Sequence, residues 1–282
     1  MPEKPTSMLL TGFVLLVSSC SPGTGPGPTG QAQTEAPVTL AHAPTTLTVF
    51  AAASLAEAFG DIGQQFETAN PEVMVVFNFG ASNQLAQQLG QGAPGDVFAS
   101  ANQAQMDIVI EAGRVLGGAE QTFVKNRLVV IFPEDNPGGV SALQDLRSPG
   151  LRLVLAAREV PVGQYSLDFL DKASQDAAFG TAFKDDVLKN VASYEENVRA
   201  VLAKVSLGEA DAGIVYTSDV SGESAALVGR LDIPENLNTI ASYPIAPIRD
   251  SANFPLAQAF VDFVLSRSGQ DTLTRYGFIP VK

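Results

Sequence analysis

Two short segments carry hydroxyl groups at positions suited to binding an anion. The segment AAAS at 51–54 follows an apolar run and opens a stretch with helical spacing, and GASN at 80–83 repeats this construction. The first turn of a helix leaves backbone N–H groups without partners and carries the positive end of the helix dipole. Small residues before Ser54 and Ser82 allow a ligand close to the backbone. Each segment therefore offers a hydroxyl and amides, the donors that an oxyanion requires.

Each serine taken alone is also explained as a helix cap. Ser54 is followed three residues later by Glu57, the spacing of a capping box, and Ser82 is a suitable N-cap. A cap needs no ligand. Both segments follow predicted parallel strands, however, and the carboxyl ends of such strands meet at one edge of a sheet. This arrangement favours a shared oxyanion cradle.

The elements that position these serines alternate between strands and helices from Thr46 onward. Strands are predicted at 46–50, 72–79, 96–99, 127–132, 152–155, 212–216 and near 239–248, and helices from 54 and from 82 and at about 102–112, 163–173, 176–190, 196–207, 253–266 and 268–276. This alternation predicts an α/β fold with mostly parallel sheets, in two lobes with a ligand in the crevice between them.

The counts of reactive residues argue against several kinds of chemistry. The 282 residues include one cysteine, Cys20, one histidine, His42, and no tryptophan. One cysteine permits no internal disulfide, CxxC pair or thiolate metal cluster. One histidine argues against a Ser-His-Asp or Cys-His catalytic unit and a His-rich metal site. We expect no cofactor and no enzyme, although carboxylate catalysis stays open. The net charge of −13 argues against a nucleic-acid partner.

The N-terminal residues predict export and lipid anchoring. Ten uncharged residues at 8–17 are too few to span a bilayer and are typical of a signal peptide, which we assign to 1–19. The following VSSC, ending at Cys20, resembles the bacterial lipobox, in which the signal is cut before a cysteine that is then lipidated. An ordinary buried cysteine is the alternative.

Residues 20–45 are rich in Pro, Gly, Thr and Ala and predict a flexible, lipid-anchored linker that contains His42. We expect the protein outside the cytoplasm, in the periplasm or at the cell surface, tethered to the membrane through Cys20.

Several segments from Thr46 onward together resemble the periplasmic molybdate-binding proteins of ABC transporters. The matching segments are LTVFAAASL (47–55), FGASNQLAQQLGQGAPGDVFASAN (79–102), VPVGQYS (160–166), ENVRAVLAKVSLGEADAGIVYTSDV (196–220), YPIAP (243–247) and RYGF (275–278). The resemblance implies a two-lobed periplasmic-binding-protein fold, each lobe a mostly parallel sheet flanked by helices. We assign lobe 1 to 46–125 and 236–282, and lobe 2 to 126–235.

The resemblance also implies the ligand-binding residues, because that family holds its dianion with hydroxyls and backbone amides. The implied donors are the hydroxyl and N–H of Ser54 and Ser82, the N–H of Val162 and Val198, and the phenol of Tyr216. Molybdenum arrives as molybdate, so these residues also form the molybdenum site. Some relatives carry Ala in place of Val162, which alters packing but leaves a backbone donor unchanged. Without the match, Tyr216 at the end of an apolar strand is more typical of a core residue.

Three charged residues near the matched segments receive other roles. Arg199 follows Val198 on a predicted helix, and we expect it in a surface or lobe-bridging ion pair. Asp96 and Asp219 would repel a dianion from within the cleft. We expect them as caps or as supports behind the donors.

These observations predict high-affinity extracytoplasmic binding of molybdate and tungstate by a monomer that delivers them to an ABC permease and its ATPase. A donor-only pocket suits a fully deprotonated dianion, whereas rejection of sulfate would depend on cavity size, since an unpaired buried donor costs about 1–3 kcal/mol. The alternatives are a binding protein for sulfate or another tetrahedral oxyanion, a sensor lipoprotein that feeds no permease, and a carboxylate enzyme.

Overall fold

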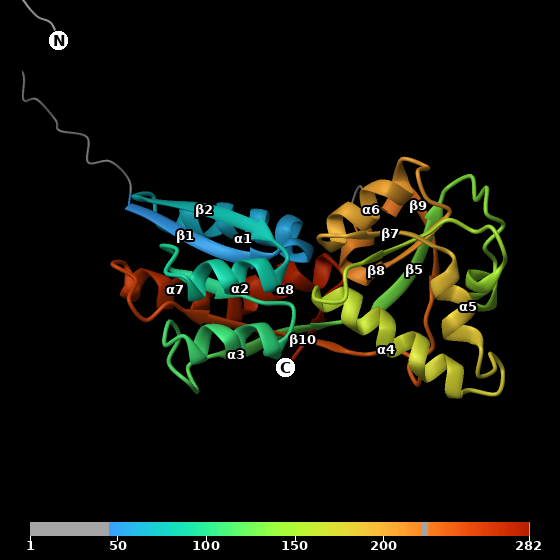
Figure 1. The fold of residues 1–282 in the computed structure, drawn as a ribbon. Coiled ribbons are helices and arrows are strands. Elements are labelled where there is room, and N and C mark those ends of the chain that lie inside the picture. The colour runs from blue at the N-terminus through green and yellow to red at the C-terminus, as the bar shows by residue number, and fades with distance from the viewer. Residues whose placement is uncertain (1–44, 222–224, 282) are drawn as a thin grey trace, which may run out of the picture. The chain divides into compact units, whose positions relative to one another are not determined.

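The computed structural model describes residues 45–221 and 225–281. The chain from Ala43 onward forms one compact unit, and its described part contains two β-sheets with their own helices (Figure 1). The predicted signal peptide, the linker up to residue 44, Cys20 and His42 lie outside the described residues. Within the described residues, no helix has both the length and the apolar character needed to cross a membrane.

The first sheet has six strands in the order β11-β4-β10-β3-β1-β2. Its strands are β1 (Thr45–Ala52), β2 (Val73–Gly80), β3 (Val97–Ala99), β4 (Gln121–Asn126), β10 (Ala241–Pro247) and β11 (Ile279–Pro280). The helices that contact it or each other are α1 (Ala56–Ala69), α2 (Ser82–Gly90), α3 (Gln103–Glu111), α7 (Phe254–Leu265) and α8 (Arg267–Arg275). A 3-10 turn, η1 (Ala53–Leu55), joins β1 to α1.

The second sheet has five strands in the order β7-β6-β8-β5-β9. Its strands are β5 (Leu128–Pro133), β6 (Leu153–Ala156), β7 (Val191–Glu195), β8 (Ala212–Tyr216) and β9 (Val228–Asp232). Beside it lie α4 (Pro161–Gln175), α5 (Phe183–Lys189) and α6 (Val198–Ser206), with 3-10 turns η2 (Leu143–Arg147) and η3 (Thr217–Val220) (Figure 1).

The α/β class and the two sheets flanked by helices confirm the predicted fold class, but the expectation of mostly parallel sheets is wrong. In the first sheet β1 is parallel to β2 and β3, whereas β10 is antiparallel to β3 and β4. In the second, β5 is antiparallel to both neighbours. The chain passes from β4 of the first sheet into β5 of the second through Arg127 alone.

Four strands escaped prediction because their apolar signal is weak. β7, β9 and β11 lie at sheet edges and consist mostly of half-buried and exposed residues, and β4 carries exposed polar residues. The helix predicted at 176–190 is confined to α5 (Phe183–Lys189). The apolar spacing predicted for α1 is confirmed, since Phe59, Ile62 and Phe66 are buried on its inner face.

Aromatic rings dominate the core between α1, α7 and the first sheet. Phe260 of α7 is fully buried, and its ring centroid lies 6.1 Å from that of Phe59, 5.3 Å from that of Phe66 and 6.3 Å from that of Phe77. Edge-to-face aromatic pairs at such separations stabilise the fold beyond the area that they bury. This core holds α1, and with it η1, against the sheet.

Replacing Phe260 with Ala should lower the free energy of unfolding by about 3–5 kcal/mol, because the substitution removes buried surface and leaves a cavity. Urea denaturation at constant pH measures the change. The matched control is Phe254→Ala on the same helix, where the side chain is 37% exposed and the change should stay within about 1 kcal/mol. Equal losses in the two variants would contradict this account of the core.

Candidate functional site

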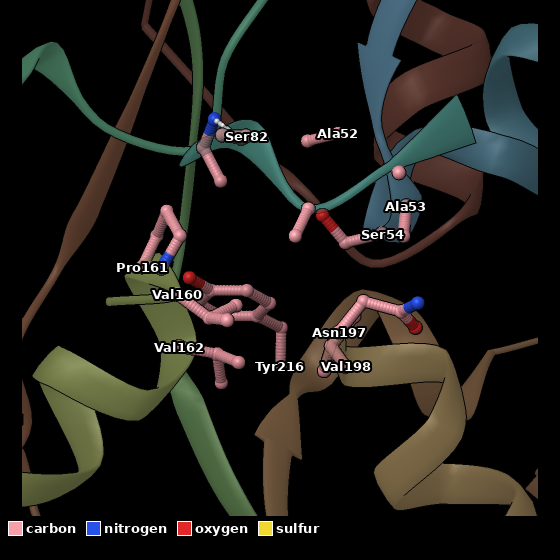
Figure 2. A pocket seen from close by; sticks show the side chains of 13 residues that line it. Ala52, Ala53, Ser54, Ser82, Val160, Pro161, Val162, Asn197, Val198 and Tyr216 are labelled. Carbon is pink, nitrogen blue, oxygen red and sulfur yellow. Dashed lines mark hydrogen bonds between the residues drawn. The ribbon is translucent and has the colours of Figure 1, made fainter. Parts of the chain in front are cut away.

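The five residues that the resemblance implied as donors line one pocket (Figure 2). All five are buried, with exposures of 7% for Ser54, 1% for Ser82, 1% for Val162, 4% for Val198 and 1% for Tyr216. The complete lining is Ala52, Ala53, Ser54, Gly80, Ala81, Ser82, Ala101, Val160, Pro161, Val162, Asn197, Val198 and Tyr216. The cavity has a volume of about 20 Å³, so the pocket suits a small ligand.

The pocket lies at the carboxyl ends of the parallel strands of both sheets. It receives residues that end or follow β1, β2 and β3 in the first sheet, and β6, β7 and β8 in the second. In open α/β sheets these ends carry the strand-to-helix turns, where ligands bind. The fold therefore brings turns that are far apart in sequence to a single point.

Helix starts surround the pocket. Pro161 is the first residue of α4 and has no N–H, so Val162 carries the first amide of that helix. At α6 the side chain of Asn197 accepts a hydrogen bond from the N–H of Ala200 at 3.0 Å. The amide of Val198, at the start of α6, has no partner within its own helix. Both residues line the pocket, and the first-turn amide of each has no partner within its own helix.

Neither serine caps its helix, so the predicted capping box is wrong. Ser54 lies inside η1, and its Oγ is 2.9 Å from the hydroxyl of Tyr243. Ser82 is the first residue of α2 rather than its N-cap, and its Oγ accepts a hydrogen bond from the N–H of Ala101 at 3.0 Å. The 3-10 turn causes the difference, because it delays the start of α1 and leaves Glu57 in the first turn of that helix.

Tyr216 ends β8 with its hydroxyl toward the pocket (Figure 2). Among the described residues this buried hydroxyl has no hydrogen-bond partner. Burial raises the pKa of Tyr216 well above its ordinary value, so the phenol stays protonated. A buried donor without a partner costs about 1–3 kcal/mol, and a ligand oxygen would remove that cost.

Among the described residues, those that line the pocket include no charged side chain. Arg199 instead forms a partly exposed ion pair with Glu57, at 2.9 Å, which joins α6 to α1, in line with the expected surface or lobe-bridging pair. Asp96 accepts hydrogen bonds from the N–H of Thr48 and the hydroxyl of Ser251, so it is a structural acceptor away from the pocket, as expected.

Asp219 lies behind Tyr216 in η3 and is 1% exposed. Its Oδ2 accepts a hydrogen bond from the N–H of Tyr216 at 2.9 Å, and its Oδ1 has no partner among the described residues. Burial raises the pKa of Asp219 to about 7, although that hydrogen bond and the charge of Arg199 act in the opposite direction. Asp219 thus supports Tyr216 from behind, as predicted, and titrates near neutral pH.

Three further residues bear on the site and had no assigned role. Asn197 lines the pocket and caps α6. Its position directly before an apolar helical stretch is a local signal that finds such caps. Tyr243 contacts Ser54 directly, and Asn126 contacts Tyr243. Because Asn126 and Tyr243 lie 117 positions apart, no local sequence pattern joins them.

The chain is similar to known solute-binding proteins. Residues 47–279 match the family model described as bacterial extracellular solute-binding protein. The molybdate-binding protein ModA of Mycobacterium tuberculosis (strain ATCC 25618 / H37Rv) is 38% identical over 274 residues, which cover 97% of this chain and 95% of that protein.

Two solved structures share the fold at lower identity. The sulfate-binding protein SubI from Mycobacterium tuberculosis H37Rv has a TM-score of 0.75 at 18% identity, covering 84% of this chain and 88% of that one. The periplasmic molybdate-binding protein of Azotobacter vinelandii has a TM-score of 0.73 at 19% identity, covering 84% and 100%. The predicted two-lobed binding-protein fold is confirmed, and the fold itself does not distinguish molybdate from sulfate.

Asp219→Asn should change how stability depends on pH. In the wild type the raised pKa of Asp219 means that folding retains a proton which the unfolded chain releases, so this contribution is present below about pH 4 and is lost as pH rises to about 7. Over that window the variant should gain up to about 1.4 kcal/mol per pH unit relative to the wild type. Urea unfolding at several pH values measures the difference, and the exposed Asp232→Asn is the control. Parallel pH profiles would contradict the prediction.

Gly163→Ala should destabilise the start of α4. A Cβ at this position would collide with the backbone carbonyl oxygens of Ala156 and Ala157 at the end of β6. We expect a loss of about 1–3 kcal/mol in the free energy of unfolding. Gly60→Ala in α1, where a Cβ meets nothing within 4 Å, is the matched control and should be neutral or stabilising. Chemical denaturation compares the two variants. An unchanged free energy of unfolding in Gly163→Ala would contradict the prediction, because it would mean that α4 shifts away from β6 at no cost.

Proposed function

Because the chain belongs to the family of bacterial extracellular solute-binding proteins, we propose that it binds molybdate and tungstate outside the cytoplasm and delivers them to an ABC import permease. The observation that carries the proposal is a buried pocket with uncharged hydrogen-bond donors from both sheets. The 38% identity to ModA of Mycobacterium tuberculosis over 97% of this chain supports the choice of anion.

The proposed ligands are Ser54 and Ser82 through hydroxyl and N–H, Val162 and Val198 through N–H, and Tyr216 through its phenol. They match a tetrahedral dianion because a fully deprotonated oxyanion only accepts hydrogen bonds. Helix starts add the positive ends of their dipoles. The surface charge of −13 does not oppose binding at contact range, since it is screened over about 8–10 Å.

The arrangement of the sheets supports the proposed division into lobe 1 (46–125 and 236–282) and lobe 2 (126–235), except that Asn126 ends a strand of the first sheet. The first sheet takes strands up to Asn126 and from Ala241 onward, and the second takes the strands from Leu128 to Asp232. With donors on both sides, the anion would hold the lobes together, and Arg199–Glu57 would add a contact at the rim.

The anion is cargo in this proposal, and the protein acts as a monomer without cofactor or catalysis. Membership of a solute-binding family supports a role that is not enzymatic. Export and a lipid anchor on Cys20 rest on the sequence pattern at 8–20. Among relatives, a putative ABC transporter substrate-binding lipoprotein of Bacillus subtilis, YvgL, is compatible with this form.

Sulfate is the second candidate, because the sulfate-binding protein SubI has the same fold. Charge and shape are the same for the two anions, so only cavity size separates them. A smaller anion leaves some of the buried donors beyond hydrogen-bond distance, each at a cost of about 1–3 kcal/mol. A panel of tungstate, molybdate, sulfate and phosphate in titration calorimetry decides between the candidates.

The double variant Ser54→Ala/Ser82→Ala should bind tungstate at least about a hundredfold more weakly than the wild type, because it removes two hydrogen bonds to a charged ligand. Titration calorimetry on the purified protein measures both affinities. Ser141→Ala/Ser268→Ala, two exposed serines, is the matched control and should bind as the wild type does.

Two outcomes would count against the proposal. A wild-type protein that binds neither molybdate nor tungstate at micromolar concentration would refute the function. Wild-type affinity in the Ser54→Ala/Ser82→Ala variant would leave the function intact but refute the site.

A further inference from the structure

A serine hydroxyl both donates and accepts, so two serines do not by themselves make a donor-only pocket. If a hydroxyl proton points away from the pocket, a lone pair faces the ligand and favours an anion that still carries a proton. Selectivity for a fully deprotonated anion therefore requires that each hydroxyl proton be directed into the pocket. The contacts behind the two serines show how this is achieved.

The direction of the Ser82 proton is set by the backbone. The N–H of Ala101 lies 3.0 Å from the Oγ of Ser82, and a backbone N–H only donates. Ser82 is therefore the acceptor in that contact. Its own proton remains for the pocket, which it lines.

The direction of the Ser54 proton depends on Tyr243. The two hydroxyl oxygens are 2.9 Å apart, and either is chemically able to donate. The hydroxyl of Tyr243 also lies 3.4 Å from the Nδ2 of Asn126. The ring of Tyr216 packs edge-to-face on that of Tyr243, but the hydroxyl of Tyr216 makes no hydrogen bond among the described residues. An amide nitrogen only donates, so Tyr243 accepts from Asn126 and has Ser54 as the acceptor for its own proton.

The orientation of the Asn126 amide is itself determined by its neighbours. Its Oδ1 accepts from the N–H of Arg127 at 3.0 Å and from the hydroxyl of Thr217 at 3.0 Å. Because the N–H of Arg127 only donates, the oxygen must be on that side. The NH₂ group then faces Tyr243 and Ser218, to whose Oγ it donates at 2.8 Å.

We propose that Asn126 and Tyr243 are positioning residues that direct the Ser54 proton into the pocket and thereby set selectivity for fully deprotonated oxyanions. The chain of donors runs from Asn126 to Tyr243, from Tyr243 to Ser54, and from Ser54 to the ligand. Asn126 and Tyr243 are both fully buried, so water does not compete for these contacts. This inference rests on the proposed function, since it concerns the same anion site.

The relay formed by Asn126, Tyr243 and Ser54 contacts both sheets. Asn126 ends β4 of the first sheet, and its amide bonds to Thr217 and Ser218 of η3, which follows β8 of the second. Tyr243 lies on β10, where the register shifts between Tyr243 and Pro244. The relay therefore sits where the chain crosses from one sheet to the other, behind the pocket.

The test compares tungstate with hydrogen phosphate at pH 8, where both anions are doubly negative but only phosphate keeps a proton. Tyr243→Phe removes the donor to Ser54 and leaves that hydroxyl free to accept. We expect tungstate affinity to fall about tenfold and the ratio of tungstate to phosphate affinity to fall by at least as much. Titration calorimetry measures tungstate, and displacement of tungstate measures phosphate.

Asn126→Asp tests the direction of the relay with little change in shape. A carboxylate accepts from Tyr243, so Tyr243 must in turn accept from Ser54, whose proton then leaves the pocket. The same ratio should fall in this variant. Because both anions carry equal charge, repulsion by the new carboxylate affects them alike and does not produce this change.

The matched control is Tyr276→Phe, which removes a phenol that donates to Asp61 at 2.9 Å outside the pocket lining. It should leave the affinity ratio unchanged. Thermal unfolding of each variant verifies that it is folded. A wild-type protein that binds no tungstate would overturn the proposed function, whereas wild-type binding with an unchanged ratio in Tyr243→Phe and Asn126→Asp would overturn the relay alone. If Tyr243 and Asn126 had only a structural role, their substitution would lower the affinities for tungstate and phosphate equally. A lowered ratio of tungstate to phosphate affinity excludes that role.

Discussion

Amide groups in the first turn of a helix have no partner within that helix, and burying them costs free energy until an acceptor reaches them. In this protein the first turns of α2, α4 and α6, together with η1, open on one pocket. The rest of the architecture serves to bring these starts together. Parallel strands supply the turns, and the two sheets face their turns toward the same space.

The pocket that these amides line is also free of charged side chains among the described residues. A charged side chain in a buried site would need its own partner when the ligand is absent. Hydroxyls and amides carry a smaller penalty, which leaves the site intact without ligand. Charge is instead kept behind and around the donors, where Arg199 pairs with Glu57 and Asp219 supports the backbone of Tyr216. Burial raises the pKa of Asp219 to about 7, which makes folding sensitive to pH.

The mixed sheets follow from joining the two halves of the site. A lobe built only from crossover units would be fully parallel, but then no strand would lead directly into the other lobe. The passage from β4 through Arg127 into β5 provides this link, and β5 pairs antiparallel with β8. Asn126 lies at that passage and contacts Ser218 behind the second sheet and Tyr243 in the first, so the side chain that directs the donor proton also touches both sheets.

The sequence by itself determined most of the elements and the donor types. Alternating apolar runs and helical spacing predicted the α/β class and most helices, and the small residues before Ser54 and Ser82 marked two anion-binding turns because such turns are local features of the chain. Tertiary structure alone decided the mixed sheets, the edge strands with weak apolar signals, and the position of Ser54 inside η1 instead of at a helix cap. It also decided the contacts of Tyr243 with Ser54 and Asn126, since packing joins residues that no periodic pattern connects.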